Sequence, residues 1–221
     1  MNNKIIAAGV VVVLCAVALI GVGYAYTATF ENVDNKINSD AQYITIFKDG
    51  TGVSSSTVTV SKTDFIIPFD TNTKKDGSNY KTTYTPNITD GTDNWKLVSG
   101  TNYTKTIPKT VSVTVDTTKA ATPGGSFTMV VTTPASVTPT EKSGVTGIST
   151  SVSKIYVGET PVDATDNSNG TFSGTFSGNA DAVVTVKVVF NITFTVNKVD
   201  LDYAPVDMEN VGFNVKYVVS P

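Results

Sequence analysis

Any chemistry in this chain would have to come from carboxylates, because the sequence contains no histidine. Without histidine, a Ser-His-Asp triad, a Cys-His pair and an ordinary zinc site are excluded. The single cysteine, Cys15, lies inside an apolar N-terminal segment, so the remainder has no thiol. A carboxylate pair could hydrolyse glycosides, and the candidates are Asp200, Asp202 and Asp207. We interpret them as a solvated connection between two strands and expect no enzyme activity.

Two acidic stretches offer oxygen ligands of the kind that calcium prefers. The stretch "DATDNSNG" contains Asp163, Asp166, Asn167 and Asn169, and "TDGTDN" contains Asp90 and Asp93. Neither stretch has the spacing of an EF-hand, and Asp and Asn are also ordinary turn formers. We therefore predict turns at both places and expect neither a metal nor a cofactor.

Asparagine in a sequon can accept a glycan in an exported protein. Sequons occur at Asn87, Asn102, Asn169 and Asn191. Chance gives a similar number in a chain so rich in Asn, Ser and Thr, so the number carries no information. Asn169 lies in a predicted turn and Asn191 on the polar face of a predicted strand, which favours their accessibility. Glycosylation at these positions is a hypothesis that the intact mass of the native protein would test.

Charge and aromatic content exclude one class of partner and leave another open. All 16 basic residues are lysine, and the formal net charge is −3 at pH 7. Nucleic-acid recognition depends on arginine and on a basic surface, so we expect no nucleic-acid partner. Trp95 and the tyrosines could form a platform for sugars. Aromatic side chains are more often buried in a sandwich core, and we favour that interpretation.

The elements that must position these residues are strands. Residues 183–197, "VVTVKVVFNITFTVN", alternate apolar and polar side chains with a period of two, which is a strong strand signal. At about 3.3 Å per residue this strand is long, so we predict a bend or a bulge in it. The same alternation occurs over 110–116, 126–132 and 211–219, and weaker strand patterns occur over 42–48, 56–61, 64–69, 95–99 and 153–158.

Turn signals such as "KDGTG", "KKDGSN" and "SGNAD" separate these strands, and no segment after Tyr26 has a helical period. Many strands with regular turns predict an all-β fold, an antiparallel β-sandwich of the jelly-roll kind. We expect one domain over residues 26–221. The alternative is two Ig-like domains, 26–120 and 121–221. The Pro- and Thr-rich stretch 132–144 is predicted to be a long exposed loop.

The apolar run over residues 5–24 carries no charge and would cross about 30 Å of hydrocarbon as a helix. Lys4 precedes the run and small residues follow it, so residues 1–25 form a predicted signal peptide with cleavage after Ala25. The first alternative is an uncleaved transmembrane anchor. The second is a type IV pilin-like leader cut before the run, against which the short basic region argues. Each alternative exports residues 26–221 and gives an extracellular or cell-surface location.

Strand-like alternation resumes directly after the apolar run. Tyr26, Ala28 and Phe30 alternate with Thr27 and Thr29. A strand with no tight hairpin to its neighbour can pair with its own sheet or with the sheet edge of another copy. Pairing with its own sheet is the plainer of these two interpretations.

A leader ending in Gly-x-Gly-Tyr-Ala-Tyr, a short strand containing Phe30 and the following "NVDNKINSDAQYITI" resemble the start of TasA/camelysin-type surface proteins and of the archaeal bundling pilins similar to them. The resemblance covers residues 1–45 and the all-β character of the rest. It implies an exported jelly-roll subunit that polymerises by donating an N-terminal strand to the next subunit, with residues 26–30 as the donor strand. Camelysin-type proteins have been called metalloproteases. This chain has no HExxH motif, so that activity is not carried over.

These observations predict a structural subunit of an extracellular filament or surface layer, a homopolymer assembled by N-terminal strand addition. The first alternative is a surface adhesin or binding module held in the membrane by an uncleaved N-terminal helix. The most distant alternative is an exported carbohydrate-active enzyme that uses carboxylates.

Overall fold

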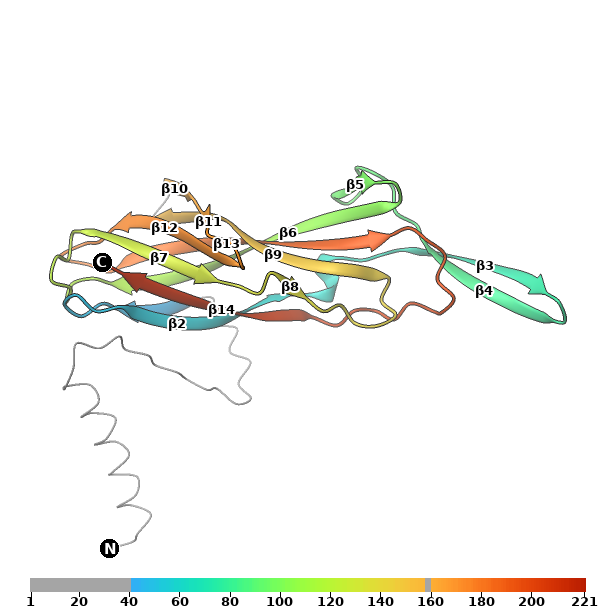
Figure 1. Ribbon diagram of the computed structural model, residues 1–221, viewed down its shortest axis with the longest axis horizontal. Coiled ribbons are helices and arrows are strands. Elements are labelled where there is room, and N and C mark those ends of the chain that lie inside the picture. The colour runs from blue at the N-terminus through green and yellow to red at the C-terminus, as the bar shows by residue number, and fades with distance from the viewer. Residues whose placement is uncertain (1–40, 158–159) are drawn as a thin grey trace, which may run out of the picture.

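The computed structural model describes residues 41–157 and 160–221. This part of the chain forms two β-sheets stacked face to face, with a narrow two-stranded ribbon projecting from one end (Figure 1). The predicted leader, cleavage site and donor strand lie outside the described residues. Among the residues that the structure describes, no helix is long and apolar enough to span a membrane.

The larger sheet has seven strands with β13 near its centre. Its strands are β1 (Ala41–Thr45), β5 (Trp95–Ser99), β6 (Asn102–Asp116), β8 (Ser136–Val137), β9 (Val145–Val157), β10 (Thr160–Asp163) and β13 (Val184–Asn197). β13 pairs antiparallel with β6 along its whole length and with β9 on its other side. The β1–β6 pair is parallel, which makes the sheet mixed rather than antiparallel throughout as predicted.

The smaller sheet has five strands in the order β11-β12-β7-β14-β2, all antiparallel. Its strands are β2 (Gly52–Val60), β7 (Ser126–Thr132), β11 (Thr165–Asp166), β12 (Thr171–Ser177) and β14 (Val211–Ser220). Because β2 pairs with β14 and β6 with β13, each sheet combines strands from both sides of residue 121.

The core lies between the two sheets and is built from the apolar faces that the alternation predicts. Phe190 of β13 meets Phe213 of β14 edge-on, with ring centroids 6.3 Å apart. Tyr217 is fully buried, and its hydroxyl forms a hydrogen bond of 2.9 Å with Ser56 Oγ. Burial raises the pKa of Tyr217 to about 12. Each such large side chain contributes roughly 1.5–3 kcal/mol through burial.

Most strand predictions are confirmed, including those over 126–132 and 95–99. The irregularity predicted in the longest strand is also present, as register shifts against β9 between Val189 and Phe190 and between Thr195 and Val196. The strand predicted over 64–69 is wrong. A 3₁₀ turn, η1 (Lys62–Asp64), and an irregular segment occupy it, and only Phe69 belongs to a strand. The apolar side chain of Phe65 instead stacks on Phe194 at 4.1 Å.

The projecting ribbon consists of β3 (Phe69–Asp76) and β4 (Asn79–Pro86), and we call residues 69–86 the arm. Of the arm, the sequence predicted only the turn, because its polar strands have no apolar face. Gly77 in the turn has a left-handed φ of 60°, which glycine adopts without strain. Backbone hydrogen bonds of 2.9 and 2.7 Å between Tyr84 and Leu201 join the base of the arm to the β13–β14 connection.

Candidate functional site

The carboxylates considered for catalysis lie in the exposed connection between β13 and β14. Asp200 accepts a hydrogen bond from Thr85 Oγ1 of the arm. Asp202 forms an ion pair of 2.9 Å with Lys81, and this contact raises the pKa of the Lys81 ammonium group. Asp207 is exposed further along the connection. In the structure, Asp200 and Asp202 attach the connection to the side of the arm.

Both oxygen-rich stretches contain a turn, as predicted, at residues 168–170 and 90–94, whereas Asp163 and Asp166 end the strands β10 and β11. Asp166 Oδ1 accepts a hydrogen bond of 2.8 Å from the backbone N–H of Ser168, and Asp90 Oδ1 accepts one of 2.7 Å from that of Leu97. Asn169 has a left-handed φ of 54°, a conformation that Asn tolerates in turns. Within residues 41–157 and 160–221, no group of three or more Asp, Glu, Cys or His side chains could hold a metal ion.

The sequon asparagines lie at four separate places in the fold. Asn87, Asn102 and Asn169 are exposed, whereas Asn191 is half-buried on the outer face of the central strand β13. Asn87 Nδ2 donates a hydrogen bond of 3.0 Å to Asp70 Oδ1. Glycosylation at these positions stays a prediction.

Trp95 does not belong to a surface platform, because its side chain is only 2% exposed. This confirms the core interpretation for that residue. Lys105 Nζ lies 5.8 Å from the centroid of the Trp95 ring. Tyr43 and Tyr80 are the exposed tyrosines of the described residues, and they lie on different elements, β1 and β4.

Sheet edges are the remaining candidate sites, since an unpaired edge offers N–H and C=O groups to another strand. Within the described residues, the outermost strands β1, β2, β10 and β11 pair on one side only, and the inner strands β6 and β14 also contain unpaired stretches. One is residues 106–111 of β6, between the parts of the strand that pair with β5 and with β1. The other is residues 211–215 of β14.

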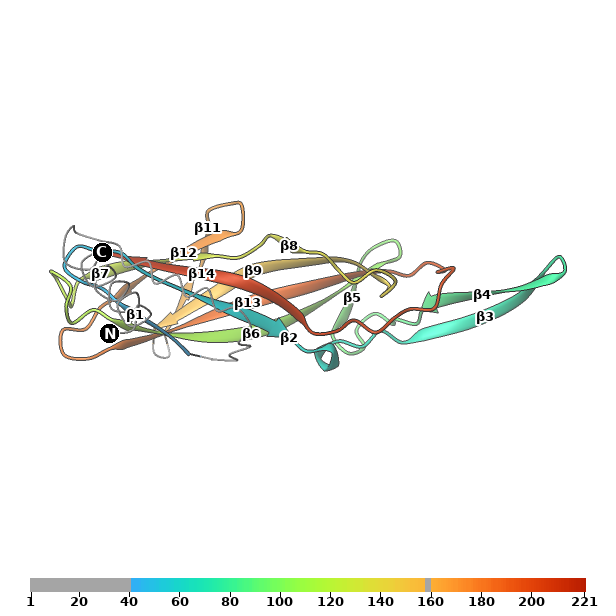
Figure 2. The same cartoon turned by 90° about the horizontal axis from the view of Figure 1, so that it is seen from below.

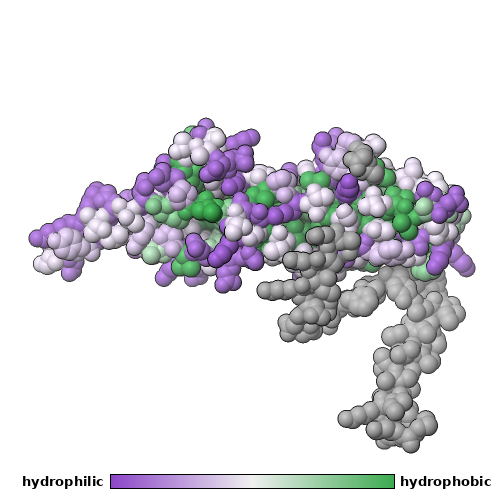
Figure 3. Space-filling model, turned by 180° about the vertical axis from the view of Figure 1, so that it is seen from behind, coloured by the Kyte–Doolittle hydropathy of each residue, from purple (hydrophilic) through white to green (hydrophobic). Residues whose placement is uncertain are grey.

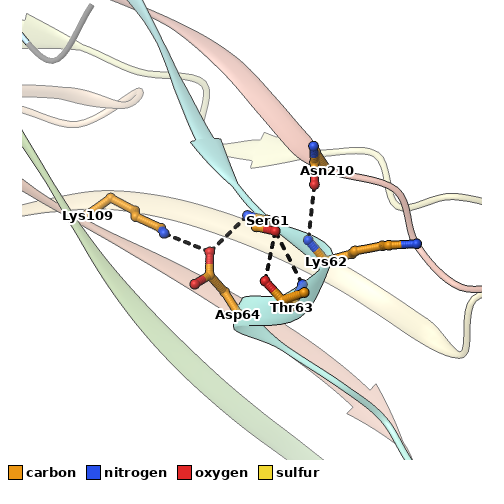
Figure 4. A network of polar contacts seen from close by, with 6 residues as sticks. All are labelled: Ser61, Lys62, Thr63, Asp64, Lys109 and Asn210. Atoms are coloured by element: carbon orange, nitrogen blue, oxygen red, sulfur yellow. Dashed lines mark hydrogen bonds and ion pairs between the residues drawn. The ribbon is translucent and has the colours of Figure 1, made fainter. Parts of the chain in front are cut away.

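The unpaired stretch of β6 is a poor acceptor of a further strand. Pro108 has no backbone N–H to donate. The η1 turn is fixed against the same stretch, because Asp64 Oδ2 accepts hydrogen bonds from Lys109 Nζ at 2.6 Å and from the Ser61 N–H at 2.8 Å (Figure 4). The Lys109 hydrogen bond is the main cause that lowers the pKa of the Asp64 carboxyl.

The unpaired stretch of β14 lacks these obstacles. β7 pairs with β14 only over Lys216–Ser220, because the chain leaves the sheet after Thr132 and continues to β8 of the other sheet. Figure 2 shows this segment diverging from β14. Within the part of the chain that the structure describes, residues 211–215 share backbone hydrogen bonds only with β2.

A groove of about 550 Å³ opens where β7 and β14 diverge, and we call it the β7–β14 groove. It is lined by residues 53–55, 132–135 and 214–216 and by Asn169, so Lys216 is its only charged lining residue. One wall is fixed, because the Thr133 N–H donates a 2.8 Å hydrogen bond to the Gly170 carbonyl. Gly170 has a φ of 73°, and a Cβ there would collide with the Thr133 carbonyl oxygen. The groove therefore combines an uncharged lining apart from Lys216 with a strand edge that has free backbone groups.

Comparisons of the chain with protein-family models, curated proteins and solved structures give no match. The interpretation of the groove therefore depends on its geometry. The sequence predicted the strand β14. It did not predict that β7 pairs with only part of β14, over Lys216–Ser220. The available signal was Pro134, two residues after the end of the predicted strand 126–132, because proline cannot donate a ladder hydrogen bond.

Proposed function

We propose that the chain is an exported structural subunit of an extracellular filament or surface layer, and that copies assemble by N-terminal strand addition. The proposal includes a jelly-roll-like arrangement of the sandwich and release or anchoring at the cell surface. The observation that carries it is the unpaired stretch of β14 beside the β7–β14 groove.

The proposed donor strand, residues 26–30, matches this stretch in length and in pattern. Val211, Phe213 and Val215 point into the core, and Gly212 and Asn214 point outward. Neighbouring strands share the alternation of faces, so a donor would place Tyr26, Ala28 and Phe30 on the inner side and its threonines outside.

The donor would contribute mainly through its backbone. Phe213 is already 5% exposed without it, so little further core surface remains to be covered there. Each ladder hydrogen bond adds about 0.5–1.5 kcal/mol. Residues 31–40, which connect the donor to β1, span at most about 36 Å when extended, so the proposal requires the groove of an adjacent copy to lie within that distance of β1.

Disulfide cross-linking tests this assembly in the full chain with Cys15→Ala. Thr27→Cys or Thr29→Cys is combined with Asn214→Cys, since opposed residues in a ladder meet the distance that a disulfide requires. We expect a ladder of covalent oligomers on a non-reducing gel from one of the two pairs. The three single-cysteine variants are the controls. A bond within one chain, or no bond in either pair, would contradict assembly between copies.

Ala28→Pro gives an independent result, because it removes one ladder donor from the proposed strand. We expect filaments to disappear in electron micrographs of native material, while Asn35→Pro in the connection preserves them. N-terminal sequencing of the filaments should begin at Tyr26. Filaments that persist with Ala28→Pro would exclude residues 26–30 as the donor.

A further inference from the structure

The arm is the part of the molecule whose structure the sandwich does not explain. Every residue of β3 after Phe69 is exposed, and Tyr80 of β4 is 74% exposed. In the space-filling view from behind, the arm shows hydrophilic and intermediate colours, whereas the apolar residues gather over the sandwich (Figure 3). A two-stranded ribbon with no covered face is only marginally stable in water.

Charge is distributed unevenly along the arm. Near the tip, Lys74 lies directly opposite Lys81, and Lys75 lies opposite Tyr80. Like charges in opposed positions destabilise a strand pair. Lys81 is compensated by Asp202, but among the described residues neither Lys74 nor Lys75 forms an ion pair.

The base of the arm has the opposite charge. Asp70 lies at the start of β3, and Asp200 lies beside Thr85 near the end of β4. Asp70 uses Oδ1 for its hydrogen bond with Asn87, and its side chain is otherwise exposed. Asp76 at the end of β3 offsets only one of the tip lysines. The arm therefore carries excess positive charge at the tip and negative charge at the base.

One edge of the arm is also unpaired. β4 is joined to Leu201 at its base, whereas β3 pairs with β4 alone within the described residues. The N–H and C=O groups along the outer edge of β3 are free to form a ladder with another strand.

We propose that the arm binds the arm of a second copy, with the two β3 strands antiparallel about a two-fold axis. This orientation brings the basic tip of each arm to the acidic base of the other, whereas a parallel orientation would place tip against tip. When Phe69–Asp76 overlaps its symmetry mate completely, Asp70 lies opposite Lys75 of the second copy and Thr71 opposite Lys74. Both copies use the same surface in this contact, so the contact joins two copies and does not extend into a chain. It does not depend on strand addition, which uses β14.

Charge reversal in the full chain tests this pairing. Asp70→Lys alone sets two ammonium groups against each other, because the new lysine faces Lys75 of the second copy. Lys75→Asp alone sets two carboxylates together. We expect each variant to lower the association constant in sedimentation equilibrium by roughly tenfold at low salt, since two symmetry-related attractive contacts become repulsive. An equimolar mixture of the two variants, or both changes in one chain, restores opposite charges and should restore association.

The measurements are made with Ala28→Pro present in every protein, so that strand addition does not contribute to association. Cysteine variants give the register: Asp70→Cys mixed with Lys75→Cys, both with Cys15→Ala, should form a mixed disulfide dimer, and neither should dimerise alone. Association that is unchanged by the single reversals, or a mixture that fails to restore it, would overturn the proposal. Thermal unfolding of each variant checks that the fold is intact.

Discussion

The β6–β13 pair and the β3–β4 pair are both antiparallel and rich in threonine, yet only the first is part of a core. Each carries a pair of opposed threonine hydroxyls 2.9 Å apart, Thr106 with Thr193 and Thr73 with Thr82. The inner face of β13 buries side chains such as Phe190 and Ile192 against the second sheet, whereas β3 is exposed after Phe69 and β4 is at most half-buried before Pro86.

The comparison shows that residues that favour an extended backbone allow a strand pair to form, whereas burial of one face makes the pair stable. Threonine and tyrosine favour an extended backbone in either place. Burial of apolar surface, at about 25 cal/mol per Å², is available only where a second layer covers one face. The stability of the protein is therefore concentrated in the sandwich, and the arm leaves one backbone edge and its charges exposed to solvent.

The largest expected effect is the difference in unfolding free energy between truncating an aromatic side chain in the core and truncating one on the arm. Phe190→Ala removes a fully buried ring and should lower the free energy of unfolding by about 3–5 kcal/mol. Tyr80→Ala, the matched change on the arm, should alter it by less than about 0.5 kcal/mol. Chemical denaturation measures both. An equal loss for Tyr80→Ala would show that the arm is packed in the free protein.

A smaller loss of unfolding free energy is expected when one threonine of a hydrogen-bonded hydroxyl pair is replaced by valine. The Thr133 and Thr150 hydroxyls are 3.0 Å apart in the interior, and Thr150 also donates to the Pro134 carbonyl. Thr150→Val should lower the free energy of unfolding by about 1–3 kcal/mol, because it leaves buried polar groups unpaired. Thr82→Val, in the exposed pair of the arm, should change it by less than about 0.5 kcal/mol. Similar losses at the two positions would refute the comparison.

The smallest effect is a pH dependence at the end of β6. Asp116 Oδ1 accepts hydrogen bonds from the Thr118 hydroxyl at 2.6 Å and the Thr118 N–H at 3.0 Å, and Tyr43 donates to Oδ2. These contacts, the Thr118 hydroxyl first, lower the pKa of the Asp116 carboxyl from 3.8. Because the folded-state pKa is the lower one, this stabilisation is present above pH 3.8 and is lost as the pH falls through the folded-state value.

Asp116→Asn should therefore be less stable than the unaltered protein at pH 7, and the difference should shrink in acid. Denaturation midpoints at neutral pH and below the ordinary Asp pKa measure this change. Asp202→Asn in the β13–β14 connection removes the exposed ion pair with Lys81 of the arm and serves as the control, with little effect at neutral pH. A difference for Asp116→Asn that stays constant into acid would rule out the carboxylate as its source.

Prediction from the sequence succeeded where one face of a strand is buried. The alternation over 183–197 and 211–219 identified inward residues such as Val186, Phe194 and Tyr217, all fully buried. It failed over 64–69, where Phe65 and Ile67 contact the core from an irregular segment. It also missed β3 and β4, because strands exposed on both faces have no apolar period to detect.

The candidate site was less accessible to sequence reasoning than the fold. Residues 26–30 were singled out by their alternation and by the resemblance, and they lie outside the described residues. The proposed acceptor stretch of β14 depends on where β7 ends, and the proposed arm contact depends on which edge of the arm is left unpaired. Both are relations between strands distant along the chain.

The sequence by itself determined the all-β class, the inward faces of the long strands and the absence of histidine and of thiol chemistry beyond Cys15. These follow from residue type and from a period of two, which are local properties. Only the tertiary structure decided that β1 pairs parallel, that β14 has an unpaired half and that the arm stands clear of the sandwich. Strand order and edge exposure result from packing two layers against each other, and a local pattern does not record them.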